Sequence, residues 1–335
     1  MTSYISPSNV CGLPPGESDA SPRQTMDWSL ATIAALLLLT VLFSWLRQDP
    51  QFACAPSWYW RMKLSWKSDA DFVCVGDSTV YRGLNPKVFE EAGIATQALN
   101  FGFSSVALSR EYLLSAASKF KQGAPEKRLL VGVTQWALTP RARTANDFVA
   151  ARREESESHL PIEWLIALDS LLVGTRPIPI DLIFRSKGDP TTIARATKSD
   201  YIETYHMNGW VESDYLHADW TRGLATQRIN FDHSNMVQAA LIEEARSTLQ
   251  QIQDRDDVQV ILVTMRSHPE VDALSDQLSG MDLTALAHML RPTRGEVFEF
   301  HPDTGDSYDG IHLSSACADR LSHSLADFAK QPSPR

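Results

Sequence analysis

The stretch Phe72-Val73-Cys74-Val75-Gly76-Asp77-Ser78 decides the fold that this sequence predicts. Its four leading apolar residues are typical of a strand that is covered on both faces of a sheet. Ser78 follows directly after the strand and a short turn. We therefore expect Ser78 at the carboxyl end of a strand, the edge at which open α/β sheets place their ligands.

A second stretch near the other end of the chain reads Tyr308-Asp309-Gly310-Ile311-His312-Leu313. Asp309 and His312 are three residues apart on one turn, so the carboxylate can hold the imidazole while the imidazole reaches a serine. Each motif is weak alone, because Gly-Asp-Ser is often a plain turn and His312 could cap the last helix. Together they supply the nucleophile, base and orienting carboxylate of a serine hydrolase, which predicts Ser78, His312 and Asp309 as catalytic residues.

Strand and helix patterns alternate over most of the remaining chain. The expected strands are 71–76, 96–103, 128–136, 258–265 and 296–300. The expected helices are one that Asn85 caps and Pro86 begins, then 106–121, 161–172, 236–254, 270–290 and 315–330. This order predicts an α/β fold, with a doubly wound parallel sheet flanked by helices.

The regular alternation is interrupted at residues 140–233, which are rich in charges, prolines and aromatic side chains. We interpret this region as an insertion that could cover the substrate. Its aromatic and imidazole groups could stack on sugar rings or simply pack a loop, and packing is favoured. They are His206, Trp210, His217 and Trp220.

An apolar stretch precedes the predicted α/β domain, which we place at residues 70–330. Residues 28–46 contain 19 residues without a charge, about the length that crosses a bilayer. Only Arg23 precedes them as a base, and no cleavage site of the signal-peptide kind follows, so an uncleaved transmembrane helix is favoured over a signal peptide. Residues 1–27 are predicted to be a disordered tail.

Residues 47–69 form a juxtamembrane segment that interleaves tryptophan and tyrosine with arginine and lysine. Such a mixture can rest among lipid headgroups. It can equally be the first segment that packs against the α/β domain, and the sequence leaves both readings open. The basic residues after the apolar stretch outnumber those before it, so the positive-inside rule alone places the large domain in the cytoplasm.

Charge and cysteine content exclude several classes of function. The net charge of -10, without clustered Lys and Arg, argues against nucleic-acid binding. No C-x-x-C occurs, which excludes a zinc ribbon. Asp303, Asp306 and Asp309 do not have the spacing of a calcium loop, so we predict no metal and no cofactor. Cys74, inside the first strand, is interpreted as a small buried hydrophobe.

Three blocks of this sequence resemble the SGNH, or GDSL-like, hydrolase superfamily. They are Gly76-Asp77-Ser78, Asn100-Phe101-Gly102 and Asp309-Gly310-Ile311-His312. The resemblance covers about residues 70–328 outside the insertion. It implies a flavodoxin-like three-layer α/β/α sandwich, in which Ser78 attacks an acyl carbonyl and Asp309 orients His312. It also implies that the backbone amides of Ser78 and Gly102, with one side chain, hold the oxyanion.

The third strand departs from the family pattern. The family usually places an Asn just after this strand, whereas Gly132-Val133-Thr134-Gln135-Trp136 contains none. Thr134 or Gln135 could donate the hydrogen bond instead. Arg266 follows a later strand end and could bind an anionic substrate group. His268, close by, is a weaker candidate base than His312 because no carboxylate lies at the matching spacing.

The anchor and the insertion make the chain similar to a membrane-anchored branch of this superfamily, near the alginate O-acetylation proteins and the D-alanine transfer protein. The resemblance implies a domain on the periplasmic side of the inner membrane, against the charge count. It also implies a multi-span membrane-bound O-acyltransferase as partner and an acylated, in particular acetylated, glycan or cell-envelope polymer as substrate. Two alternatives stay open: a non-catalytic glycan-binding or scaffold subunit, and a membrane-tethered lipase.

Overall fold

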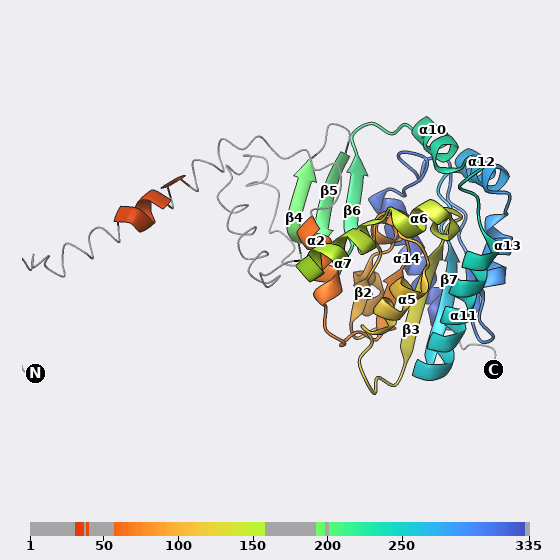
Figure 1. The fold of residues 1–335 in the computed structure, drawn as a ribbon, viewed down its shortest axis with the longest axis horizontal. Coiled ribbons are helices and arrows are strands. Elements are labelled where there is room, and N and C mark those ends of the chain that lie inside the picture. Colours follow the sequence, from red (N-terminus) through yellow and green to blue (C-terminus); the bar gives the residue numbers. More distant parts are fainter. Residues whose placement is uncertain (1–30, 37, 40–56, 158–191, 198–200, 332–335) are drawn as a thin grey trace, which may run out of the picture. The chain divides into compact units, whose positions relative to one another are not determined.

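The computed structural model describes the greater part of the chain (Figure 1). The described residues are 31–36, 38–39, 57–157, 192–197 and 201–331. The chain divides into two units, of which the first comprises residues 1–48 and 172–177 and the second comprises the rest.

In the first unit, the described residues 31–36 and 38–39 are helical and exposed. They belong to the apolar stretch 28–46, most of which lies outside the described residues. Among the helices that the structure describes, none has the length and apolarity needed to span a membrane. The predicted tail 1–27 and the predicted helix 161–172 also lie outside the described residues.

A sheet of five parallel strands forms the centre of the second unit. The strands are β1 Phe72–Val75, β2 Ala98–Asn100, β3 Lys127–Val133, β7 Val258–Thr264 and β8 Glu296–Glu299. Their spatial order is β2-β1-β3-β7-β8, and Val73 of β1 lies opposite Leu99 of β2 and Leu129 of β3. The predicted α/β class with a parallel sheet is therefore confirmed.

Helices cover both faces of this sheet. On one face lie α5 Arg110–Ala117, α11 Ala239–Asp256 and α13 Leu283–Leu290, and on the other α3 Ser78–Gly83, α4 Pro86–Glu91 and α14 Ser315–Ala329. The side chains of β1 alternate between the two layers: Val73 and Val75 pack into the first, Phe72 and Cys74 into the second. This arrangement is consistent with a three-layer sandwich, and Cys74 is buried as expected.

Local sequence signals fix the ends of several helices. The Asn85 side chain accepts a hydrogen bond from the backbone N–H of Lys87 at 3.1 Å, and Pro86 begins α4, as the sequence predicted. The helical stretch expected at 270–290 is two helices, α12 Pro269–Ser279 and α13. Gly280, with φ 70°, ends α12 in the left-handed conformation, and Asp282 caps α13.

The region 140–233 contains a three-stranded antiparallel sheet that the sequence pattern did not predict. Its strands are β4 Thr192–Thr197, β5 Tyr201–His206 and β6 Val211–Tyr215 (Figure 1). The pattern was obscured because polar residues are buried in it: Glu203 of β5 accepts from Arg82 of α3 at 2.6 Å and from Tyr205 at 2.5 Å. The turn after β5 contacts the main sheet, since Asn100 N–H donates to the Asn208 carbonyl.

The helix α2, Ser57–Ser65, lies within the segment that the sequence left open. Tyr59, Trp60 and Met62 are buried in the same core as β1, so this part of 47–69 packs against the domain. Lys63 is fully buried, and its ammonium group donates to the Gly102 carbonyl at 2.7 Å. Burial lowers the pKa of Lys63 well below its usual value.

Candidate active site

The turn that presents Ser78 is built by the two residues before it. Gly76 has φ 150°, and a Cβ atom there would lie 2.4 Å from a methyl group of Val80. Asp77 caps α3: its Oδ1 accepts from the backbone N–H of Thr79 at 2.9 Å and from the Thr79 hydroxyl at 2.7 Å. Ser78 is consequently the first residue of α3, just past the end of β1.

Ser78, His312 and Asp309 form one chain of hydrogen bonds. Ser78 Oγ lies 2.9 Å from His312 Nε2, and His312 Nδ1 lies 2.7 Å from Asp309 Oδ2. With Nδ1 donating to the carboxylate, Nε2 is left to accept the serine proton. The structure thus brings together the three residues that the sequence singled out, from chain positions 234 residues apart for Ser78 and His312.

The Asp309 carboxylate is held in its ionised form. Its Oδ1 accepts from the backbone N–H groups of Ile311 at 2.9 Å and His312 at 2.8 Å. Burial alone would raise the pKa of Asp309, but the His312 ring and these two N–H groups outweigh burial and lower the pKa to about 2. A charged carboxylate at this place can stabilise an imidazolium on His312.

A cavity of about 500 Å³ opens over Ser78 and His312. Residues that follow four different strands of the parallel sheet line it: Ser78 after β1, Ser105 after β2, Gln135 after β3 and Ser267 after β7. The cavity therefore lies outside the carboxyl ends of the strands, where β1 separates β2 from β3 and the connections reverse direction. This is the common position of ligand sites in doubly wound sheets.

The three groups proposed as oxyanion donors beside Ser78 all donate elsewhere. Gly102 N–H donates to Asn100 Oδ1 at 3.0 Å. The Thr134 hydroxyl donates to Asp77 Oδ2 at 2.5 Å, and Gln135 Nε2 donates to Asp276 Oδ1 at 2.5 Å. These contacts give Thr134 and Gln135 positioning roles, at the nucleophile turn and at α12 respectively.

Backbone amides near Ser78 remain as donors. In the described part of the chain, the N–H groups of Ser78, Ser104 and Ser105 have no hydrogen-bond partner. Ser105 has φ 55°, a left-handed conformation that is uncommon for a residue other than glycine and is concentrated at functional sites. This conformation could not be predicted, because nothing in Phe103-Ser104-Ser105 demands it.

Arg266 and His268 do not line the cavity. Arg266 donates to the Thr284 hydroxyl at 3.2 Å and lies 3.9 Å from Asp276 and 3.8 Å from Asp282. His268 is buried, and its ring stacks on Trp220 at 4.2 Å. The structure therefore does not bring either residue to Ser78.

The imidazole and indole groups of the insertion mainly pack, as the sequence favoured. His206 stacks on Trp210 at 4.9 Å, and Trp210 Nε1 donates to the Arg82 carbonyl at 3.0 Å. His217 is exposed. Asp306, three residues before Asp309, pairs with Arg320. No group of His, Cys, Asp or Glu suited to a metal ion occurs among the described residues.

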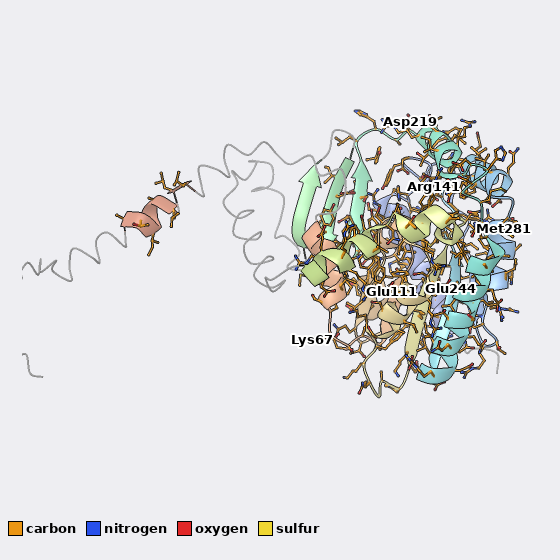
Figure 2. All side chains as sticks on the ribbon, in the orientation of Figure 1. Lys67, Glu111, Arg141, Asp219, Glu244 and Met281 are labelled. Carbon is orange, nitrogen blue, oxygen red and sulfur yellow. The ribbon has the colours of Figure 1, made fainter. Side chains whose placement is uncertain are left out.

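The insertion contacts the turn of Asp309 and His312 through α10, Thr221–Asn230. A Cβ atom at Gly223 would lie 3.0 Å from the Asp309 carbonyl oxygen and 3.0 Å from Gly310 Cα. Just before the helix, Asp219 N–H donates to the Tyr308 carbonyl at 2.7 Å; Figure 2 labels Asp219. The position of α10 is thus tied to the turn that carries Asp309 and His312.

Asp272, on α12, is a cavity residue that sequence reasoning missed. Burial raises its pKa to about 7, although the Ser267 backbone N–H and Arg266 act in the opposite direction. A carboxyl group with such a pKa in a cavity is a candidate functional group. Its sequence context, Glu270-Val271-Asp272, is that of an ordinary helix first turn, so only the fold reveals it.

Comparison of the chain with protein-family models, with curated proteins and with solved structures gives no match.

Proposed function

We propose that this chain is a serine acyl esterase or O-acyltransferase of the SGNH type, with Ser78 as nucleophile. The observation that supports the proposal is the hydrogen-bond chain from Ser78 through His312 to Asp309, of which Ser78 and His312 line a cavity. An isolated Ser–His contact occurs in many proteins. A serine at the start of a helix, bonded to a histidine that a buried ionised carboxylate orients, is the arrangement that nucleophilic acyl transfer requires.

In the proposed mechanism, Ser78 Oγ attacks the acyl carbonyl carbon while His312 Nε2 accepts the hydroxyl proton. Asp309 stabilises the resulting imidazolium. The imidazolium then protonates the departing alcohol, which leaves an acyl ester on Ser78. Water or a second alcohol attacks this ester as His312 again accepts a proton, and Ser78 is restored. The Ser78 N–H and the amides of Ser104 and Ser105 are the donors placed to stabilise the oxyanion.

The finer part of the proposal concerns place and substrate. Residues 28–46 anchor the chain in the inner membrane, with the catalytic domain in the periplasm and a multi-span O-acyltransferase as partner. The substrate is an acylated, in particular acetylated, glycan or cell-envelope polymer. Support for this part comes from the uncharged stretch, the insertion beside the site and the sequence blocks that resemble the membrane-anchored SGNH branch.

Covalent labelling tests the proposal. The full-length chain in detergent is treated with a fluorophosphonate, and peptide mass spectrometry locates the adduct. We expect labelling at Ser78 that is lost in His312→Ala and retained in His323→Ala, whose imidazole lies exposed on α14. If the folded wild-type chain is not labelled at Ser78, Ser78 is not an activated nucleophile.

A non-catalytic glycan-binding or scaffold subunit is the second candidate. The observation that favours it is the use of Thr134, Gln135 and the Gly102 amide in other hydrogen bonds. This candidate predicts that Ser78→Ala leaves polymer acylation in cells unchanged, whereas the enzyme predicts its loss. Release of fatty acid from phospholipid vesicles by the purified chain would instead indicate the membrane-tethered lipase.

A further inference from the structure

The cavity over Ser78 continues between two helices that do not carry the triad. On one side α10 contributes Thr226, Gln227 and Asn230, and on the other α12 contributes Asp272 and Ser275. Thr226 and Asn230 are four residues apart and so lie on one face of α10. The Thr226 and Ser275 hydroxyls donate to carbonyls of their own helices, so they are left to accept hydrogen bonds from a ligand. The amides of Gln227 and Asn230 can both donate and accept.

The cationic side chains that line the cavity already have acidic partners. Arg82 pairs with buried Glu203 at 2.6 Å, and Arg141, which is labelled in Figure 2, pairs with Asp232, two residues after the end of α10. In the described lining no other Lys or Arg occurs, while Asp77 and Asp272 are both present. An anionic group entering the cavity would therefore meet carboxyl groups without an uncommitted cation to balance its charge.

The helix α10 connects this part of the cavity to the turn that carries Asp309 and His312. The helix touches the catalytic turn at Gly223, and Asn230 lies seven residues further along. A rise of 1.5 Å per residue places Asn230 about 10 Å from that contact along the helix axis. Asn230 and Ser78 line the same cavity, so a group bound at Asn230 shares that cavity with the serine.

We propose that the space between α10 and α12 is the binding subsite for the alcohol part of the substrate, and that it takes an uncharged polyhydroxylated group through Asn230, Gln227 and Asp272. This inference rests on the proposed acyl-transfer function and adds a location and a charge preference to it. Asn230 and Gln227 can bond to the hydroxyls of such a group as donors and as acceptors, and Asp272 faces them from α12. None of these residues touches the reacting atoms, so each determines specificity.

Partitioning of the acyl-enzyme tests the subsite. The full-length chain in detergent is acetylated with p-nitrophenyl acetate, and the acetyl group is offered equal concentrations of glycerol, 1-propanol or glycerate. The measured quantity is the ratio of acetylated alcohol to acetate, which does not depend on how fast Ser78 is acylated. We expect glycerol to give a ratio roughly three- to tenfold higher than either other alcohol, as one or two hydrogen bonds would produce.

Substitutions on α10 and on α12 test whether these helices cause the preference for glycerol. Asn230→Ala and Asp272→Asn should each reduce the glycerol ratio by roughly two- to fivefold. The matched control Asp327→Asn, on the exposed face of α14, should leave it unchanged. Equal ratios for the three alcohols, a higher ratio for glycerate, or wild-type ratios in both Asn230→Ala and Asp272→Asn would overturn the subsite. Absence of p-nitrophenolate release that depends on Ser78, judged against Ser78→Ala, would instead overturn the proposed function, and the subsite with it.

Discussion

The two sides of the Ser78 site differ in how their polar groups are used. On the base side, the Asp309 carboxylate bonds to His312 and to the Ile311 backbone N–H, and the His312 ring bonds to Asp309 and Ser78. On the opposite side, Thr134 and Gln135 bond away from Ser78, to Asp77 and Asp276. If the proposed acyl transfer holds, the difference implies that side chains activate the serine, whereas backbone amides stabilise the oxyanion.

The largest effect is expected on the base side. Asp309→Asn should lower turnover of p-nitrophenyl acetate by roughly 10³- to 10⁴-fold, because an amide stabilises neither the required tautomer nor the imidazolium. The control Asp303→Asn changes an exposed carboxylate on the same loop and should leave turnover near the wild-type value. A loss of turnover below tenfold for Asp309→Asn would contradict the role of Asp309 in activating Ser78 through His312.

Two Gly→Ala variants test whether contact with α10 keeps the turn of Asp309 and His312 in position. The Gly223→Ala methyl group would press on Asp309 and Gly310 at 3.0 Å, so the catalytic turn must shift. We expect a roughly ten- to hundredfold loss of turnover. The control Gly305→Ala adds a methyl group with no atom within 4 Å, and its turnover should match wild type. Equal turnover in the two variants would show that the contact with α10 does not affect the positions of Asp309 and His312.

The two buried carboxyl groups of the site should respond oppositely to pH. Asp272 has a pKa raised from 3.8 to about 7, so the folded chain binds the extra proton and stability falls as pH rises through this interval. Asp309 has a lowered pKa, so its contribution is lost only as pH falls toward 2.

Asp272→Asn isolates this difference. We expect the free energy of unfolding of this variant minus that of wild type, both measured in urea, to increase by roughly 1 to 3 kcal/mol from pH 5 to pH 8. Tryptophan fluorescence follows the transition, with Asp327→Asn as control. A difference that does not change with pH would show that the Asp272 carboxyl is not held in its neutral form.

The smallest effect is expected on the oxyanion side. Thr134→Val should lower turnover by less than about tenfold, because its hydroxyl donates to Asp77; loss of a true oxyanion donor costs roughly 10²- to 10³-fold. Thr144→Val, which removes an exposed hydroxyl on α6 Pro140–Thr144, is the matched control. A hundredfold loss for Thr134→Val would mean that this hydroxyl turns toward the oxyanion during the reaction.

The parallel sheet was predictable because each of its main strands carries its own apolar signal. Val258–Thr264, for instance, is read from the sequence almost to the residue. The antiparallel sheet was not predictable, since Glu203 and Ser213 are buried there and their burial depends on partners such as Arg82 that are distant in the chain. Tertiary pairing overrides local pattern in such strands.

The site follows the same division. Ser78, Asp309 and His312 are recognisable because short motifs carry them. The hydrogen bonds of Thr134 and Gln135, the left-handed Ser105 and the cavity position of Asp272 all arise from contacts between elements. Such contacts leave no mark in a single sequence, so the hydrogen bonds that Thr134 and Gln135 make could not be predicted from it.

The buried amine of Lys63 can report whether α2 is packed against the domain. An amine without exposed surface cannot be methylated by formaldehyde and a borane reductant while α2 is docked, whereas exposed Lys87 can. The methylation rate of Lys63, measured by peptide mass spectrometry, therefore gives the free energy for undocking α2. Lys63 also donates to the Gly102 carbonyl. The same rate therefore reports how often this hydrogen bond to the loop after β2, which contains Gly102 and Ser105, is broken.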